Sequence, residues 1–387
     1  MTEFHNQEDL TRRHEEKEKA VDMTELFYDL VFVYAISQIS HSILYTEHGD
    51  IPLYNFTKFF LMTFVFYTIW SYQTSYTNRF GMIRVKDIFF LLFNMFIAIF
   101  LAISLKSNMV SVFDAINVCV AILFASTSLQ FFLTLRDKIL AHDRFASIVF
   151  GSSMLVSALL ALLAIFIPAP WMYVAFILSI IIACTAPIPF KKKIQLSGVN
   201  VPHMAERYSL LIIIMFGEAI IGLTEIFKIN EFHFSYIMLF LILTSLFGSY
   251  WLKSNRLIHK ENYVSGLTLT IAHFMMIVGI GLINASLVLN AKEPVEDTFN
   301  IQLMYAALAF FYSGMLMTLQ YAHEKFTGDR QLRFIIPVIL IIGFAIAYLT
   351  RHFAYTLTTV CFVTTVTIFL IYLYYYYKTH PDMTKED

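Results

Sequence analysis

Charged side chains are scarce in this chain. Asp, Glu, Lys and Arg together make up 14% of the 387 residues, and 58% of the residues are hydrophobic. A soluble domain is about half apolar and about a quarter charged. The 39 Phe and 22 Tyr residues add more apolar surface than one soluble core buries. The composition therefore excludes an ordinary soluble domain and predicts a membrane protein with many spanning segments.

Cysteine is rarer still. The three cysteines, Cys119, Cys184 and Cys361, each stand alone in an apolar run, so the sequence predicts neither a disulfide framework nor a cysteine metal site. The formal net charge of −1 argues against an extended nucleic-acid-binding surface. The motifs G-x-x-x-x-G-K-[ST], H-E-x-x-H and G-x-S-x-G do not occur. We therefore expect no enzymatic activity, no cofactor, no metal site and no nucleic-acid partner.

Long apolar runs are what the chain has in abundance. A membrane helix needs about 20 mainly apolar residues. Twelve segments approach or reach this length, at residues 26–44, 57–76, 87–105, 112–134, 145–167, 170–190, 207–227, 234–252, 264–286, 302–321, 333–349 and 352–376. The expected fold class is all-α, a polytopic membrane protein with about twelve transmembrane helices.

Lys and Arg are distributed unevenly between the predicted loops. All but five of the 27 lie in the terminal segments and the even-numbered loops, and the exceptions are Lys58, Lys106, Lys228, Lys292 and Arg351. Because positive charge is retained on the cytoplasmic side of a membrane, we predict that both termini are cytoplasmic. The first 24 residues are polar and have no cleavage site, so we expect a cytosolic arm rather than a removable signal peptide.

Two parts of the chain correspond at one constant offset. Glu25 and Trp70 in the first half match Glu206 and Trp251 in the second half. An even number of helices in each half makes the halves parallel repeats, related by an axis along the membrane normal. We therefore predict a cytosolic arm (1–24), two six-helix repeats (25–193 and 194–377) and a cytosolic tail (378–387).

Acidic residues enter the first apolar helix. Glu25 and Asp29 are four residues apart and share a helix face, and the polar residues Gln38 and His41 follow on the same helix. Charges inside apolar helices are costly and are rarely retained without a role. Two interpretations of Asp29 stay open, a structural pair with a buried Arg or Lys and a place in a transport or signalling pathway. For Glu25, an ordinary charge at the membrane surface is the alternative.

The second half carries a related set of charges. Glu206 and Arg207 stand at the start of its first helix, and Glu218 lies about 18 Å further along. Gly217 and Gly222 flank Glu218 and would permit close helix approach or local unwinding. Glu218 is interpreted as a proton or cation site, or else as a neutral acid hydrogen-bonded between helices. We predict that Arg207 pairs with Glu25 or Asp29.

One histidine falls inside a later apolar helix. His273 is flanked by Ala272 and Phe274. A packing residue and a proton relay both fit such a position, because neutral imidazole can do either.

The two charged segments also carry a family resemblance. The run Glu25-Leu26-Phe27-Tyr28-Asp29-Leu30-Val31-Phe32-Val33, continuing to Gln38 and His41, resembles the signature of the bacterial low temperature requirement protein A family. So does His203-Met204-Ala205-Glu206-Arg207-Tyr208, followed by Gly217-Glu218 and Ile221-Gly222. The resemblance extends over nearly the whole chain and implies a multi-pass protein of the bacterial cytoplasmic (inner) membrane, linked by name to growth in the cold. It supports the chosen residues Glu25, Asp29, Gln38, His41, Glu206, Arg207 and Glu218 without assigning them a reaction.

A more distant similarity concerns Phe27-Tyr28-Asp29. This element is similar to the Phe-Ser-Asp element of a potassium-channel family of lysosomes and bacteria that is also built from six-helix repeats. The second half has Tyr208-Ser209-Leu210 at the corresponding position and so lacks the Asp. The similarity therefore does not predict a pore built identically from both halves.

Intramembrane carboxylates and duplicated helices favour a secondary transporter or ion-coupled permease. Its partners would be membrane lipids and an unidentified small solute or cation, protons included. In this hypothesis Asp29, Glu218, Gln38, His41 and His273 serve transport or coupling, and Glu25, Glu206 and Arg207 form a cytoplasmic gate network. The alternatives are a passive cation channel and a non-transporting membrane protein that senses or adjusts the bilayer in the cold.

Overall fold

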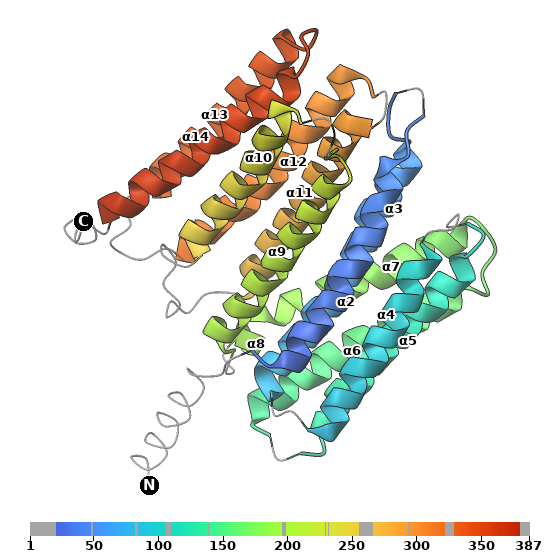
Figure 1. Cartoon of the computed structure of the whole chain (residues 1–387). Coiled ribbons are helices and arrows are strands. Elements are labelled where there is room, and N and C mark those ends of the chain that lie inside the picture. Colours follow the sequence, from blue (N-terminus) through green and yellow to red (C-terminus); the bar gives the residue numbers. More distant parts are fainter. Residues whose placement is uncertain are drawn as a thin grey trace. The chain divides into compact units, whose positions relative to one another are not determined.

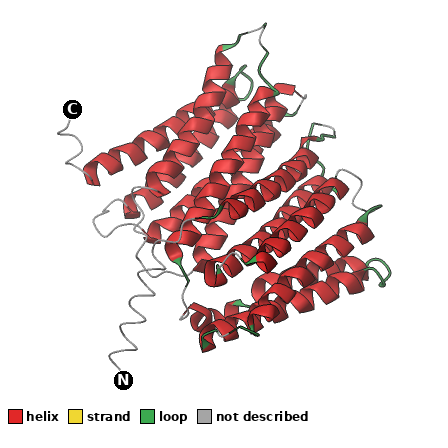
Figure 2. Ribbon diagram, turned by 60° about the horizontal axis from the view of Figure 1, so that its bottom comes forward, coloured by secondary structure: helices red, strands yellow, loops and turns green. Residues whose placement is uncertain are grey.

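A computed structural model describes residues 21–47, 49–81, 84–105, 110–137, 139–195, 199–228, 230, 232–254, 266–292, 295–321 and 329–379. Within these ranges every regular element is a helix, as Figure 2 shows. The predicted all-α class is therefore confirmed. Most of the predicted cytosolic arm and tail lies outside the described residues.

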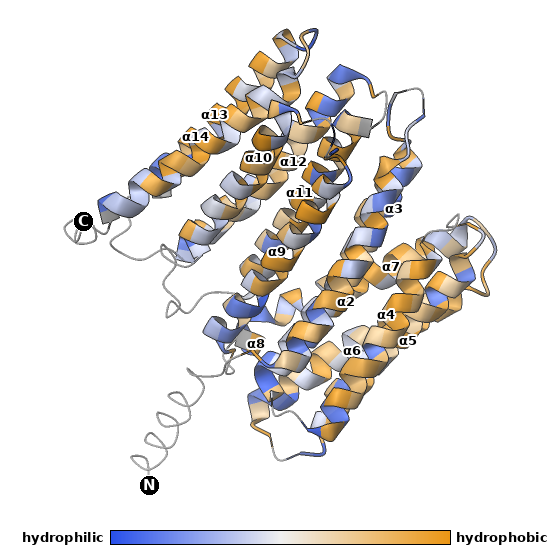
Figure 3. Cartoon of the chain, in the orientation of Figure 1, coloured by the Kyte–Doolittle hydropathy of each residue, from blue (hydrophilic) through white to orange (hydrophobic). Residues whose placement is uncertain are grey.

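Eleven helices of the described chain are long and apolar enough to cross a membrane. Figure 3 shows hydrophobic residues along most of their length, for example in α4 (Val85–Ser104) and α7 (Trp171–Thr185). A multi-pass membrane protein is therefore confirmed. Each of the twelve predicted runs falls on a helix, but the helix at 57–76 is not among the eleven. The number of crossings, the two repeats and the side of the termini stay predictions.

The chain divides into two compact units, which do not coincide with the predicted repeats. Unit 1 comprises residues 1–39 and 61–210. Neighbouring helices from α4 to α7 pack side by side within it. Figure 1 labels its α-helices. The described elements of unit 1 are α2 (Met23–Ser40) up to residue 39, α3 (Leu53–Phe80) from residue 61, α4, α5 (Phe113–Thr134), α6 (Ala141–Ala164), α7, η2 (Ile188–Phe190), α8 (Lys191–Gln195) and α9 (Val201–Thr224) up to residue 210.

Helix α3 is buried along the part that belongs to unit 1, where none of residues 61–80 is exposed. The hydroxyl of Thr68 lies 3.1 Å from Cys184 Sγ on α7, and the Tyr76 hydroxyl donates a 2.8 Å hydrogen bond to Asp87 Oδ1 on α4. Trp70 and Gln73 are buried on the same helix. A helix with protein around it has no lipid-facing stripe to keep apolar, which explains why α3 is long yet too polar to count among the eleven candidate spans.

Unit 2 comprises residues 40–60 and 211–387. Within it α11 packs on α12, α10 packs on α14, and α13 packs on both α12 and α14. Its described elements are η1 (His41–Leu44), the start of α3, the remainder of α9, α10 (Phe234–Leu252), α11 (Gly266–Lys292), α12 (Asp297–Met317), η4 (Thr318–Tyr321), α13 (Asp329–Leu349) and α14 (Thr356–Thr379).

Glycines allow close helix contacts in unit 2. A Cβ added at Gly314 on α12 would collide with the backbone carbonyl oxygen of Ala272 on α11. On α9, a Cβ added at Gly222 would collide with the side chain of Asn284, whereas one added at Gly217 meets nothing within 4 Å. Of the two alternatives predicted for the glycines around Glu218, close approach is therefore found at Gly222. Local unwinding is not found, because α9 is a continuous helix through both glycines.

We expect Gly314→Ala to destabilise the protein, because the new methyl group meets a backbone atom that cannot rotate away. Overpacking of this kind costs about 1–3 kcal/mol. Gly217→Ala is the matched control and is expected to be neutral or to stabilise by up to about 1 kcal/mol, the difference between the two residues in a helix. Thermal unfolding of the purified variants in detergent measures both effects. Equal stability of the two variants would contradict the close packing of α11 on α12.

Candidate functional site

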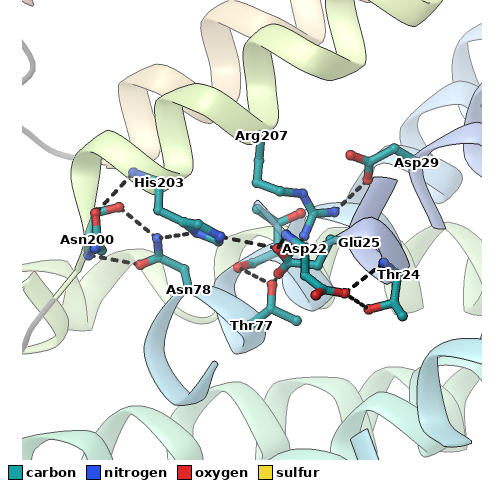
Figure 4. A network of polar contacts seen from close by, with 10 residues as sticks. Asp22, Thr24, Glu25, Asp29, Thr77, Asn78, Asn200, His203 and Arg207 are labelled. Carbon is teal, nitrogen blue, oxygen red and sulfur yellow. Dashed lines mark hydrogen bonds and ion pairs between the residues drawn. The ribbon is translucent and has the colours of Figure 1, made fainter. Parts of the chain in front are cut away.

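A buried guanidinium lies at the centre of a charged network in unit 1. Arg207, in the first part of α9, is 0% exposed. Its Nη1 lies 3.0 Å from Glu25 Oε1 and its Nη2 lies 2.5 Å from Asp29 Oδ1, both on α2. Figure 4 shows the Arg207 side chain between the two carboxyl groups. The predicted pairing of Arg207 with Glu25 or Asp29 is confirmed, and Arg207 pairs with both.

Helix α2 turns both of its carboxylates inward and exposes several large apolar side chains. Glu25 is 4% exposed and Asp29 is 0% exposed, whereas Phe27 and Leu30 are 53% and 51% exposed. This arrangement is the reverse of a soluble surface helix and is typical of a helix in lipid. The alternative that Glu25 is an ordinary charge at the membrane surface is therefore wrong, because its carboxyl group lies inside the unit.

Helix α3 completes the surroundings of Asp29 and Arg207. The indole Nε1 of Trp70 donates a 2.7 Å hydrogen bond to Asp29 Oδ1, and Arg207 Nη1 donates a 3.3 Å hydrogen bond to Thr77 Oγ1. The guanidinium carbon of Arg207 lies 5.6 Å from the centroid of a Trp70 ring. Tyr208 packs edge-on against Trp70, with ring centroids 5.0 Å apart. The aromatic rings thus keep the charges away from solvent.

His203 links Glu25 to the start of α9. Its Nε2 lies 3.2 Å from Glu25 Oε2, and its Nδ1 lies 3.3 Å from Asn78 Nδ2. Asn200 caps the helix, because its Oδ1 accepts a 3.0 Å hydrogen bond from the backbone N–H of His203. Asn78 in turn makes two hydrogen bonds to the backbone of Asn200. The helix start and the imidazole ring are therefore held by one set of contacts.

Two atoms of the network have no hydrogen-bond partner in the described part of the chain. They are Asp29 Oδ2 and Arg207 Nε, and both are buried. The other carboxylate atoms are occupied: Glu25 Oε1 accepts from Arg207, Glu25 Oε2 accepts from the backbone N–H of Asp22, and Asp29 Oδ1 accepts from both Trp70 and Arg207. Asp29 Oδ2 is therefore the available acceptor of the site.

Further unpaired polar groups lie in the interior of unit 1. Gln73 on α3, Asn94 on α4 and Gln130 on α5 are each at most 1% exposed. All six amide atoms of these side chains are without a hydrogen-bond partner among the described residues. Two of these side chains lie on the faces of α3 and α4 that meet at the hydrogen bond between Tyr76 and Asp87. Gln73 is one helix turn from Tyr76 on α3, and Asn94 is two turns from Asp87 on α4. The interior of unit 1 thus holds polar side chains on three helices, α3, α4 and α5.

The structure does not bring every predicted residue into this network. Glu206 is exposed although it neighbours Arg207, because successive helix residues point about 100° apart. Gln38 is half-buried on α2, and His41 is exposed in η1. Glu218 is half-buried on the part of α9 that belongs to unit 2.

His273 is buried in unit 2. Its Nδ1 lies 2.8 Å from the Leu269 carbonyl oxygen, and its Nε2 lies 3.3 Å from the Tyr250 hydroxyl. Lys253 lies with its Nζ 5.3 Å from the centroid of the Tyr250 ring, and burial lowers the pKa of its ammonium group to about 7. These contacts suit a packed interior histidine. Among the described residues, no group of three or more His, Cys, Asp or Glu residues could hold a metal ion.

Several network residues could not be selected from the sequence. His203 stands in the second quoted motif but carries no spacing signal, and Trp70 served only as a marker of the repeat. Thr77, Asn78 and Asn200 are ordinary polar residues near helix ends. Their positions depend on which faces of α2, α3 and α9 meet, and one sequence does not contain that information.

Removing Arg207 should destabilise the protein strongly. Arg207→Ala leaves Glu25 and Asp29 buried without a cation, and breaking such a buried pair costs about 3–5 kcal/mol. The added change Asp29→Asn is expected to restore part of the loss, because it removes one of the unpaired charges. Arg144→Ala, at an exposed position of α6, serves as the control. If Arg207→Ala and Arg144→Ala unfold at the same temperature, the buried network is contradicted.

Comparison with known proteins gives one match. No curated protein and no solved structure matches the chain. A family model described as "Bacterial low temperature requirement A protein (LtrA)" matches residues 20–369. The matched region contains every residue of the charged network, in agreement with the resemblance of the two motifs. The chain therefore belongs to the bacterial low temperature requirement A (LtrA) protein family.

Proposed function

We propose that this LtrA-family protein is an ion-coupled secondary transporter whose coupling site is the network of Glu25, Asp29 and Arg207. The observation that carries the proposal is a fully buried set of charges inside a helical membrane protein. Such charges are expensive in a membrane and typically mark ion or substrate pathways. The proposed location is the cytoplasmic membrane with both termini inside.

The balance of charges favours this proposal over a purely structural ion pair. A structural pair needs one carboxylate for one guanidinium, whereas Arg207 is shared by two carboxylates. Taking a charge out of water costs several kcal/mol even after the protein relaxes, so a second buried carboxylate is not neutral for stability. A site for a transported cation explains the surplus acid, since the ligand supplies the missing positive charge.

The polar interior of unit 1 supports a route for solutes or water. An unpaired buried polar group costs about 1–3 kcal/mol. The six amide atoms of Gln73, Asn94 and Gln130 would together approach the whole stability of a typical domain, about 5–15 kcal/mol. These atoms therefore need partners that are not protein side chains, and water or a polar solute fits the uncharged mixture of donors and acceptors.

In the proposed transporter the residues have separate roles. Asp29 binds the coupling ion, Arg207 balances its charge, and Glu25 with His203 positions Arg207 near the start of α9. Glu218, Gln38, His41 and His273 stay candidates for transport roles outside this network. Membrane lipids are the proposed partners of the exposed apolar faces, for example at Phe89, Phe96 and Phe100 on α4.

Flux measurements test the coupling role of Asp29. We expect purified protein in liposomes loaded with a pH-sensitive dye to move protons when a mixture of polar solutes is added outside. Asp29→Asn should lower the rate by roughly 100-fold, the lower range for loss of a positioned proton-transfer group. Asp114→Asn makes the same chemical change at an exposed position and should leave the rate unchanged.

The same assay separates the alternatives. Flux without added solute, together with single-channel currents in planar bilayers, would replace the transporter with a passive cation channel. No proton or cation flux, together with growth in the cold that survives Asp29→Asn, would favour a protein that senses or adjusts the bilayer.

Labelling of introduced cysteines tests the polar interior independently. In a background without Cys119, Cys184 and Cys361, we expect Asn94→Cys to react with a small water-soluble thiol reagent. Val120→Cys, at an equally buried position on α5, should be protected, because the native side chain there has no polar atom that needs a water partner. Equal protection of both cysteines would remove the proposed hydrated interior.

A further inference from the structure

The geometry points to Asp29 Oδ2 as a proton-binding atom, so that the coupling ion of the proposed transporter is a proton rather than a divalent metal cation. This inference rests on the proposed function, because it names the ion that the same site takes. It follows from the hydrogen bonds of the network, which fix the protonation of His203 and leave one carboxylate oxygen available. Figure 4 shows the contacts on which the assignment depends.

Asn78 fixes the proton position on His203. The Oδ1 of Asn78 accepts a 3.0 Å hydrogen bond from the Asn200 backbone N–H, and its Nδ2 donates a 2.7 Å hydrogen bond to the Asn200 carbonyl oxygen. These two contacts determine which end of the amide is nitrogen. The same Nδ2 faces His203 Nδ1 at 3.3 Å, so Nδ1 must be the acceptor. The imidazole proton therefore lies on Nε2, which donates to Glu25 Oε2, and the ring is neutral.

The charges of the network can now be counted. Arg207 contributes one positive charge, and Glu25 and Asp29 contribute two negative charges when both are ionised. With a neutral His203, one negative charge remains. Among the described residues, the titratable groups next to the site include the uncharged hydroxyls of Tyr28 on α2, Tyr67 on α3 and Tyr208 on α9, together with Asp22, whose Oδ1 accepts from the backbone and hydroxyl of Thr24. One bound proton makes the buried site neutral.

Only one carboxylate oxygen accepts that proton without breaking a contact. Glu25 uses Oε1 for Arg207 and Oε2 for His203 and the Asp22 backbone N–H. Asp29 uses Oδ1 for Arg207 and Trp70, whereas its Oδ2 has no partner in the described structure. A proton on Oδ2 converts the carboxylate to a carboxylic acid and leaves both hydrogen bonds to Oδ1 in place. Arg207 then forms its charged pair with Glu25 alone.

A metal cation fits the same place poorly. Calcium takes six to eight oxygen ligands, and magnesium requires near-octahedral coordination. In the described residues no cluster of three or more His, Cys, Asp or Glu side chains could hold a metal ion. A proton needs a single lone pair, which Oδ2 supplies.

Trp70 offers a direct readout of Asp29, because its indole N–H donates to Oδ1 of that residue. The chain has two other tryptophans, Trp171 and Trp251, which are 65% and 42% exposed and can be replaced by Phe. In this background, we expect the fluorescence of the purified full-length protein to show one pH transition in the physiological range, where coupling must operate. Fluorescence that does not change with pH would overturn the assignment.

Variants identify the group that titrates. Asp29→Asn should abolish the transition, and Asp114→Asn should leave it in place. His203→Gln should also retain it, because His203 is already neutral. A transition that survives Asp29→Asn, or that disappears with His203→Gln, would assign the proton to another group and overturn the proposal.

Infrared spectroscopy keeps the proposal testable if Asp29→Asn does not fold. Exposed Asp and Glu have ordinary pKa values of about 4 and stay ionised near neutral pH. A protonated-carboxyl band that appears in this range on acidification, shifts in heavy water and persists in Glu206→Gln and Glu218→Gln, two acids outside the network, is the signal expected of Asp29. The lack of such a band, or its loss in either variant, would overturn the assignment.

The measurements also separate this inference from the proposed function. A pH transition at Trp70 without flux in liposomes would remove the transporter and retain the proton site. Solute-dependent cation flux without a transition at Trp70 would remove the proton site and leave a transporter coupled to another ion.

Discussion

The burial of one guanidinium constrains the rest of unit 1. Arg207 is fully buried, and a charge in that position is tolerated only when carboxylates and hydrogen-bond acceptors surround it. Glu25 and Asp29 must therefore face α9 from α2, and Trp70 and Thr77 must face the same point from α3. The relative rotation of three helices is fixed by these contacts, because turning any of them would leave a charge buried without a partner.

The sequence predicted the charged contact but not its surroundings. Acidic residues in an apolar helix and one Arg in the matching motif were enough to predict that Arg207 meets Glu25 or Asp29. Glu206 illustrates the limit, since it is adjacent to Arg207 yet exposed. Helix rotation decides which of two neighbours is buried, and rotation depends on packing partners. The contribution of Asn78, which lies far from Arg207 along the chain, was hidden for the same reason.

Helix α3 shows where hydropathy stops being informative. A membrane helix in contact with lipid must be apolar, so composition alone predicts such helices. A helix enclosed by protein is free of that requirement and can carry Trp70, Gln73 and Asn78 where the unit needs polar groups. Low hydropathy in a long helix of a membrane protein therefore points to the interior, and here it marks the helix that carries Trp70 and Thr77 of the charged network and the unpaired amide of Gln73.

The two matching motifs are used unequally. The first supplies both acids, Glu25 and Asp29, and the second supplies Arg207, while the positions corresponding to those acids hold an exposed Glu206 and the apolar Leu210. Two more buried acids at these positions would place four carboxylates around one guanidinium, at a prohibitive cost in buried charge. Because Glu206 is exposed and Leu210 is apolar, a single negative charge is in excess. In the proposed proton-coupled transporter, one proton bound at Asp29 balances this excess charge.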